Sequence, residues 1–231
     1  MSISEKNRAI ILLSGGMDSA VCAAIARNEG YELAALHLNY GQRTEKKELE
    51  CFLKLCDYYQ ISHKLVVDVS YLAKIGGSSL TDINIEVPKP NLDSSEIPPT
   101  YVPFRNANIL SIGVSWAEVL DARYIFIGAM EGDSSGYPDC RKSFFEAFQQ
   151  AINLGTKPET NIEIKTPIID YTKSDIVKIG LNLSVPFEFT WSCYKYEDEA
   201  CGECDSCALR LRGFRNAGVE DKIKYKNYNL V

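Results

Sequence analysis

A glycine-rich segment, Ser-Gly-Gly-Met-Asp-Ser at positions 14–19, directly follows the apolar run at 9–13. This order predicts a buried strand, a tight loop and then a helix over 20–27. Such a loop directs free backbone N–H groups at one point, where the helix dipole also favours negative charge. Gly15 and Gly16 carry no Cβ that would keep an anion from the backbone. The segment therefore predicts a strand–loop–helix unit that binds an anion.

Apolar runs rich in Ile, Val and Leu alternate with helical patterns along the rest of the chain, as in βαβ units built around a parallel sheet. The apolar runs predict strands at residues 8–13, 33–38, 64–69, 124–128 and 162–167. The helical patterns lie at residues 19–27, 44–59, 106–119, 142–154 and 173–181. The predicted fold class is a Rossmann-like α/β fold, a parallel sheet with helices on both faces. Ligands bind at the carboxyl ends of such strands, so the loops after the first, second and fourth strands are expected to meet there.

A length of 231 residues allows one sizeable α/β domain with an appendage. We expect the α/β domain at residues 1–185 and a small C-terminal module at 186–231. Between residues 71 and 104 the pattern dissolves into a Gly-Gly-Ser-Ser stretch and several prolines. A connection of this length is either a functional lid or a tolerated surface insertion, and the composition favours neither.

The balance of charge and hydrophobicity is that of an ordinary globular protein, with 45% hydrophobic and 24% charged residues. No apolar run is as long as a membrane span, and the polar start at residues 2–8 does not resemble a secretory signal, so we expect a cytoplasmic protein without membrane contact. The net charge of −6 argues against stable nucleic-acid binding. The local basic exception, Arg210, Arg212 and Arg215, is predicted to be a solvated helix face.

Four cysteines near the C-terminus, Cys193, Cys201, Cys204 and Cys207, form a Cys-x7-Cys-x2-Cys-x2-Cys cluster. Two-residue gaps let backbone N–H groups wrap each sulfur, and four thiolates suit a tetrahedral Zn²⁺. Disulfides are the competing explanation, which a cytoplasmic location disfavours. Four thiolates leave no ligand position for an activated water, so we predict one structural zinc per chain that pins the C-terminal segment.

The remaining cysteines and the two histidines carry weaker signals. Cys140 lies beside a predicted substrate loop and is either a nucleophile or a packing residue, and the lack of a histidine nearby in sequence favours packing. His37 falls in a predicted strand and His63 in a predicted loop, and we expect structural or surface roles for both. Three cysteines in helical patterns are predicted to be small buried hydrophobic residues: Cys22, Cys51 and Cys56.

The loop at 14–19 lacks the Gly-Lys-Ser/Thr ending of the phosphate loop found in motor and signalling NTPases. Its Ser-Gly-Gly-x-Asp-Ser pattern instead resembles the pyrophosphate loop of the PP-loop ATPases. This resemblance implies cleavage of ATP between the α- and β-phosphates and transfer of AMP to a substrate oxygen. Asp18 would either cap the helix or hold Mg²⁺, and Ser14 and Ser19 would add hydroxyl donors. The ATP contacts that the resemblance implies are Leu13, Ser14, Gly15, Gly16, Met17, Asp18, Ser19, Ala20, Val21, Cys22 and Ala23.

Further motifs accompany the loop in a fixed order. They are Tyr-Gly-Gln-Arg at 40–43, Thr-Tyr-Val-Pro-Phe-Arg-Asn at 100–106, Ser-Gly-Tyr-Pro-Asp-Cys-Arg at 135–141 and the terminal cysteine cluster. Together they resemble the 7-cyano-7-deazaguanine synthase family, the nitrile-forming enzymes of the queuosine pathway, over residues 9 to about 214. The Gly-Tyr-Pro-Asp-Cys-Arg string joined to the cysteine tail is far more specific than the loop alone.

The resemblance implies an ATP-dependent ligase that converts 7-carboxy-7-deazaguanine and ammonia into the nitrile, with two ATP converted to AMP and pyrophosphate. It also implies an adenine nucleotide alpha hydrolase-like fold and a homodimer. Asp18 and Ser19 would act at the pyrophosphate with Mg²⁺. Lys173, at a predicted helix start, resembles the phosphate-contacting lysine of related synthetases, although it also suits an exposed helix start. Arg105 would contact the ATP phosphates or the substrate carboxylate, or else be a surface residue.

A deazaguanine presents an N1–H and an exocyclic amino group side by side, and one carboxylate can accept both. Asp133 and Asp139 are both candidates for this role, and the choice between them stays open. Arg141 suits the substrate carboxylate or a phosphate. Each of these residues also fits a turn-stabilising role. The remaining predicted substrate contacts are Gln42, Arg43 and Tyr137.

The sequence departs from the family pattern in its predicted substrate loops. Thr44 stands where a histidine is common, and the acidic residue that follows, Glu48, comes one position late. Phe104 replaces a small residue before Arg105, and Ser134 replaces a tyrosine. The pyrophosphate loop is intact, so these departures bear on the acceptor and the second step more than on ATP use.

Two other functions compete with nitrile synthesis. One is a different PP-loop adenylating enzyme, such as an amide-forming relative or a tRNA sulfur transferase. A tRNA enzyme is expected to have a basic surface and a cysteine pair near the ATP site, and the acidic balance argues against this. The other is a binding protein that retains fold and zinc without catalysis, which the intact loop disfavours.

Overall fold

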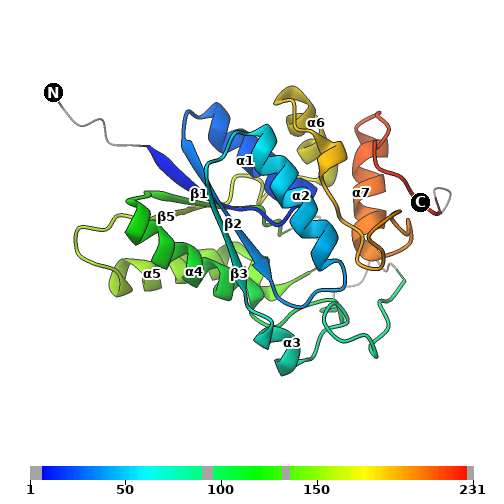
Figure 1. The fold of residues 1–231 in the computed structure, drawn as a ribbon, viewed down its shortest axis with the longest axis horizontal. Helices are drawn as coiled ribbons and strands as arrows, with labels where there is room; N and C mark the ends of the chain where they lie inside the picture. Colours follow the sequence, from blue (N-terminus) through cyan, green and yellow to red (C-terminus); the bar gives the residue numbers. More distant parts are fainter. Residues whose placement is uncertain (1–6, 90–95, 132–135, 228–231) are drawn as a thin grey trace.

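A five-stranded parallel sheet forms the centre of the molecule in a computed structural model that describes residues 7–89, 96–131 and 136–227 (Figure 1). The strand order is β3-β2-β1-β4-β5, and all four pairings are parallel. The order reverses beside β1, which creates a crevice at the carboxyl ends of β1 and β4. The strands are β1 (Arg8–Leu12), β2 (Glu32–Asn39), β3 (His63–Asp68), β4 (Tyr124–Ile127) and β5 (Glu163–Lys165).

Helices cover both faces of this sheet, so the predicted fold class is confirmed. On one face α1, α2 and α6 pack against the odd-numbered residues of β1, and on the other α4 and α5 pack against its even-numbered residues (Figure 1). All five residues of β1 are buried, as expected for a strand covered on two sides. The α-helices are α1 (Met17–Asn28), α2 (Glu45–Tyr58), α3 (Tyr71–Ile75), α4 (Arg105–Leu120), α5 (Lys142–Gly155), α6 (Lys173–Asn182) and α7 (Asp205–Asn216), with short 3₁₀ turns at Pro138–Cys140 and Phe187–Phe189.

The ten predicted elements are all present, with differences mainly at their ends. Strand β5 is shorter than predicted, because its pairing with β4 begins at Glu163 and ends at Lys165. His63 begins β3 and does not lie in a loop. Helix α3 was not predicted and lies within the segment at 71–104 that was predicted to be irregular. Helix α7 contains the arginines that were expected on a helix face, although its bounds were not predicted. No helix in the described ranges is long and apolar enough to cross a membrane.

The described part of the segment at 71–104 packs against the body of the protein. Leu72, Leu80 and Val102 are buried in a cluster with Leu38 and Tyr40 at the end of β2. Within the segment, the backbone N–H of Ser79 donates to the carbonyl of Pro99 at 2.8 Å. These contacts place the segment beside the carboxyl edge of the sheet.

Helix α7 corrects the expectation that Arg210, Arg212 and Arg215 form a solvated face. Arg215 is exposed and Arg212 is half-buried, but the side chain of Arg210 is only 1% exposed. Its guanidinium binds both carboxylate oxygens of Asp221, at 2.5 and 2.9 Å, and donates to Thr190 Oγ1 at 2.7 Å. This buried pair attaches the chain after α7 to the segment before the cysteine cluster.

Replacing Asp221 by Ala is expected to lower the free energy of unfolding by about 3–5 kcal/mol, because the Arg210 guanidinium is left buried without its counter-charge. Urea denaturation followed by circular dichroism measures the change. Asp198→Ala is the matched control, since the Asp198 carboxylate is exposed and lies 3.7 Å from Lys226 Nζ. The control is expected to leave the urea midpoint unchanged. Equal midpoints for the two variants would contradict a stabilising role for the buried pair.

Candidate active site

The glycine-rich loop joins β1 to α1 as a compact, internally bonded turn. Gly15 has a φ of +87°, and a Cβ there would lie 2.5 Å from the carbonyl oxygen of Glu48 on α2. Ser19 Oγ donates to the Gly16 carbonyl at 3.0 Å and accepts from the backbone N–H of Ser14 at 3.2 Å. Gly16 is the N-cap of α1 and provides no side-chain cap. The predicted strand–loop–helix unit is therefore present, and the first turn of α1 has backbone N–H groups without a side-chain cap.

Asp18 and Lys173 meet at the start of α1. Lys173 Nζ lies 2.8 Å from Asp18 Oδ1 and 2.6 Å from Oδ2, and Lys173 is 8% exposed. Asp18 does not cap α1, so this part of the expectation is corrected. Lys173 begins α6, where Thr172 and Asp175 form a capping box. The two residues predicted to act on phosphates are thus adjacent in space, although 155 positions separate them in the chain.

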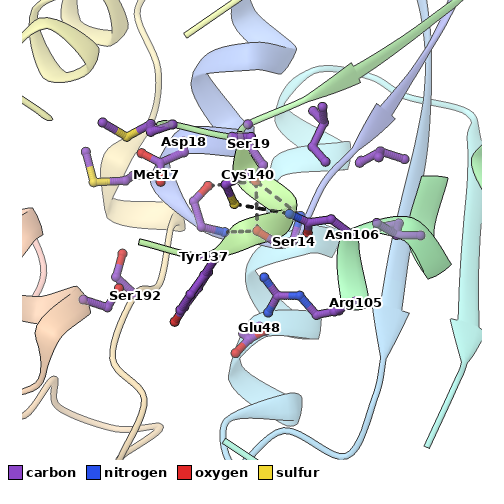
Figure 2. A pocket seen from close by; sticks show the side chains of 18 of the residues that line it. Ser14, Met17, Asp18, Ser19, Glu48, Arg105, Asn106, Tyr137, Cys140 and Ser192 are labelled. Carbon is purple, nitrogen blue, oxygen red and sulfur yellow. Dashed lines mark hydrogen bonds between the residues drawn. The ribbon is translucent and has the colours of Figure 1, made fainter. Parts of the chain in front are cut away.

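A cavity of about 250 Å³ opens beside this pair at the carboxyl ends of β1, β2 and β4. Figure 2 shows Ser14, Asp18 and Ser19 at one end of the cavity, with Arg105 and Glu48 toward the other. The loops after the first, second and fourth strands thus meet at one edge, as predicted. Met17 and Gly16 also line the cavity, whereas the other residues predicted to contact ATP do not: Leu13, Gly15, Ala20, Val21, Cys22 and Ala23, all of them buried.

Arg105 begins α4 and points into the cavity (Figure 2). Its guanidinium carbon lies 5.3 Å from the ring centre of Tyr40, and its Nη1 donates to the Tyr40 hydroxyl at 3.1 Å. Phe104, directly before it, has a φ of +57°, a left-handed conformation that glycine adopts more easily. A glycine at position 104 would adopt this backbone conformation with less strain than Phe104 does.

Tyr137 is a predicted substrate contact that lines the cavity, and it is the member of the motif at 135–141 whose aromatic ring lies there among the described residues. Its hydroxyl donates to Thr100 Oγ1 at 2.9 Å and lies 3.4 Å from the hydroxyl of Tyr194. The ring of Tyr137 stands between Arg105 and Ser192 in Figure 2. The motif at 135–141 therefore contributes an aromatic side chain to the site.

Asp139 and Arg141, from the same motif, do not line the cavity. Asp139 does not line the cavity: its Oδ2 accepts from the backbone N–H of Asn106 at 2.9 Å, which caps the start of α4. Burial raises the pKa of Asp139. Arg141 is exposed at the start of α5 and does not reach the cavity either. Asp133 and Ser134 lie outside the described residues.

Gln42 and Arg43 also bind protein atoms and do not line the cavity. Gln42 is buried, accepts from the Tyr40 backbone N–H at 2.9 Å and donates to Glu48 Oε2 at 3.1 Å. The guanidinium of Arg43 donates to three carbonyl oxygens between residues 79 and 85, at 2.6 to 2.8 Å. Gln42 thus orients the side chain of Glu48, and Arg43 holds the segment at 71–104 in place.

Cys140 lies in the cavity wall, where its sulfur accepts from Asn106 Nδ2 at 3.3 Å. Burial raises the pKa of its thiol to about 11, which leaves it protonated at neutral pH. A nucleophile needs the thiolate, so the environment favours a packing role. The cysteines predicted to be buried are buried, as is His37, whose Nδ1 lies 3.1 Å from the Leu13 carbonyl.

The four C-terminal cysteines converge into one buried cluster whose sulfurs all lie within 4.8 Å of one another. Cys201 Sγ and Cys207 Sγ are 3.8 Å apart, and a tetrahedron with zinc–sulfur bonds of about 2.3 Å places its sulfurs about 3.8 Å apart. Backbone N–H groups of Lys195 and Cys201 each approach Cys193 Sγ at 3.3 Å. The donors, distances and burial therefore fit a structural zinc ion.

The segment around this cluster forms one wall of the cavity, a position that the sequence pattern does not indicate. The backbone N–H of Trp191 donates to the Gly15 carbonyl at 2.9 Å, and Ser192 and Tyr194 line the cavity. Helix α7, which contains Cys207, packs against the start of α6. A Cβ at Gly213 would lie 2.8 Å from the Cβ of Lys173. Trp191 therefore connects the cysteine cluster to the glycine-rich loop, and Gly213 connects the helix of Cys207 to Lys173.

Glu48 and Asn106 are further cavity residues that were not predicted to bind ligand. The Glu48 carboxylate accepts from Thr44 Oγ1 at 2.8 Å, so the two departures in the Tyr-Gly-Gln-Arg region are hydrogen-bonded to one another. Burial raises the pKa of Glu48. The sequence signal that could have identified Glu48 is its place in the first turn of a helix that begins at the carboxyl edge of the sheet.

The family model and the sequence relatives point to the same family. The family model described as "Queuosine biosynthesis protein QueC" matches residues 8–218. A 7-cyano-7-deazaguanine synthase of Chloroherpeton thalassium is 61% identical over 95% of this chain and 97% of that protein. The enzyme of the same name from Chlorobium chlorochromatii is 60% identical over 95% and 96% of the two chains.

Among solved structures, an NH3-dependent NAD synthetase from Campylobacter jejuni shares 15% identity with this chain at a TM-score of 0.47. That alignment covers 81% of this chain and 68% of the synthetase. The family assignment rests on the family model and on the sequence relatives, both of which extend over nearly the whole chain. The chain belongs to the QueC family of queuosine biosynthesis proteins.

Proposed function

We propose that this protein converts 7-carboxy-7-deazaguanine and ammonia into 7-cyano-7-deazaguanine, with two ATP converted to two AMP and two pyrophosphate. The relatives at about 60% identity carry the name of that synthase. The observation that carries the ATP part of the proposal is the uncapped start of α1 facing a cavity beside Asp18 and Lys173. Such a helix start favours a phosphate group.

The chemistry explains why ATP is needed twice. A carboxylate resists ammonia because its carbon is electron-rich and the leaving group would be oxide. Attack of the carboxylate oxygen on the α-phosphorus of ATP releases pyrophosphate and gives an acyl adenylate. Ammonia then displaces AMP to form the amide and loses a proton. A second adenylation, at the amide oxygen, allows AMP to leave as the nitrogen loses its protons, which gives the nitrile.

The cavity residues divide between the two halves of this reaction. Ser14, Ser19 and the first turn of α1 would bind the departing pyrophosphate, where negative charge develops. Lys173 would contact the phosphates, and Arg105 would contact either the phosphates or the substrate carboxylate. The Asp18 carboxylate is a suitable oxygen ligand for Mg²⁺, which when bound would neutralise phosphate charge.

The four-cysteine cluster would hold one zinc ion per chain in a structural role, since four thiolates leave no position for a reacting group. Its contacts with the cavity wall support a second consequence, that the zinc keeps the wall assembled. We also propose that the protein is a cytoplasmic homodimer that acts on small molecules and does not bind nucleic acid stably, as the family resemblance and the net charge of −6 suggest.

Incubation of the protein with ATP, Mg²⁺, ammonium and 7-carboxy-7-deazaguanine tests the proposal. Mass spectrometry of the nucleobase is expected to show the nitrile at a mass 18 below that of the amide, because water is lost. The amide alone would indicate a relative that stops after the first adenylation. AMP release that requires tRNA and a sulfur donor would replace the proposal with a tRNA-modifying function.

A further inference from the structure

Within the described residues, two carboxylates line the cavity: Asp18 and Glu48. Asp18 binds Lys173 through both of its oxygens. Asp139, one of the two aspartates predicted to accept hydrogen bonds from the base, caps α4 and does not line the cavity. Among the described residues, Glu48 is therefore the carboxylate that lines the cavity away from Asp18 and Ser19 (Figure 2).

The Glu48 carboxylate is held in a fixed orientation. Its Oε1 accepts from Thr44 Oγ1 at 2.8 Å, and its Oε2 accepts from Gln42 Nε2 at 3.1 Å. Gln42 is itself fixed because its Oε1 accepts from the backbone N–H of Tyr40. The main chain of Glu48 packs directly on Gly15, which sets the distance of the carboxylate from the glycine-rich loop.

A carboxylate oxygen has two acceptor positions, so each oxygen of Glu48 retains one after its bond to protein. The two oxygens of one carboxylate can therefore accept hydrogen bonds from two parallel donors that lie side by side. An N1–H next to a 2-amino group, the guanine-like edge of a 7-deazaguanine, is a pair of this kind. The rings of Tyr40 and Tyr137 line the same cavity and provide apolar surface for a flat base.

We propose that Glu48 is the specificity-determining residue of this protein, accepting hydrogen bonds from the N1–H and the 2-amino group of the 7-deazaguanine acid. This assignment rests on the proposed function and adds the residue that selects the base. Thr44 and Gln42 are positioning residues that act through Glu48. The Gln42 of the Tyr-Gly-Gln-Arg motif therefore affects substrate binding without touching the substrate.

Two acids that differ only in the 2-amino group test the assignment: 7-carboxy-7-deazaguanine and 7-carboxy-7-deazahypoxanthine. Loss of one charge-assisted hydrogen bond to the half-buried Glu48 carboxylate is expected to lower kcat/KM of the unaltered protein about 100-fold for the second acid. In Glu48→Gln, an amide replaces one of the two acceptors with a donor. We expect kcat/KM for the deazaguanine acid to fall about 100-fold, mainly through KM, and the preference between the two acids to shrink to about threefold.

Glu50→Gln is the matched control, because Glu50 lies on the same helix, is exposed and pairs with Lys47 and Lys54. It is expected to retain the KM and the preference of the unaltered protein. The KM for ATP and the metal content are expected to be unchanged in both variants.

Unchanged KM and preference in Glu48→Gln would overturn the assignment, as would a rise in the KM for ATP in place of that for the acid. If Glu48→Gln does not fold, equal use of the two acids by the unaltered protein overturns it without a variant. A protein that makes nitrile but fails these tests refutes Glu48 alone. A protein that does not turn over 7-carboxy-7-deazaguanine at all refutes the proposed function as well.

Discussion

Replacement of Asp18 by Asn is expected to lower the rate of AMP formation about 1,000-fold. Asp18 has both carboxylate oxygens on Lys173 Nζ at the start of α1, where the proposed reaction separates pyrophosphate from AMP. The neutral amide neither orients the lysine as an ion pair nor offers Mg²⁺ a charged ligand. Pyrophosphate release measured with a coupled phosphate assay reports the rate, and metal analysis and circular dichroism report the fold.

Glu29→Gln is the control for this change, because Glu29 lies at the other end of α1 and is exposed. It is expected to retain full activity. The Asp18 variant is expected to keep its metal and its secondary structure, since Asp18 is half-buried and does not cap the helix. Turnover in Asp18→Asn within tenfold of the unaltered protein would mean that the active site lies elsewhere.

Replacement of Cys204 by Ser is expected to remove the metal and to weaken ATP binding together. Loss of a structural zinc lowers the free energy of unfolding by about 4 kcal/mol or more, which at about 2–4 °C per kcal/mol lowers Tm by about 10 °C. ATP binding is expected to weaken because Trp191, which packs on the cluster, also donates to the Gly15 carbonyl. Metal analysis, thermal unfolding and equilibrium binding of ATP measure the three effects.

Cys56→Ala provides the comparison for this variant, since Cys56 is buried in the main core away from the cluster. It is expected to keep about one zinc per chain and unchanged ATP affinity. In a Trp116→Phe background Trp191 is the one remaining tryptophan, so its fluorescence reports directly on the conformation of the cavity wall. A metal-free Cys204→Ser protein that binds ATP normally would show that the cluster does not maintain the cavity.

The sheet could be predicted because its central strands, β1 and β2, are buried on both faces. Residues 9–12 of β1 are all apolar, and such runs between helical patterns indicate a parallel sheet. The burial of α7 could not be predicted in the same way, because its buried face includes Arg210. That arginine is compatible with the interior only through Asp221, and this pairing is not visible in the local pattern.

The site was predictable at the level of loops but not of individual side chains. The motifs indicated which strand ends border the cavity, since parallel strands bring their carboxyl ends together. They did not distinguish side chains that face the cavity from those that hold the loops, so Gln42 and Asp139 were assigned to substrate although both bind protein atoms. Trp191, Ser192 and Tyr194 were missed because only long-range packing brings that segment to the loop at 14–19.

The position at which ATP is cleaved is the most direct test of the central claim, that the start of α1 receives the pyrophosphate released when AMP is transferred to an acid. ³¹P NMR of a complete reaction with ATP, Mg²⁺, ammonium and 7-carboxy-7-deazaguanine measures it. The expected result is AMP and pyrophosphate in equal amounts, with two of each for every nitrile formed. Accumulation of ADP and phosphate would contradict the claim.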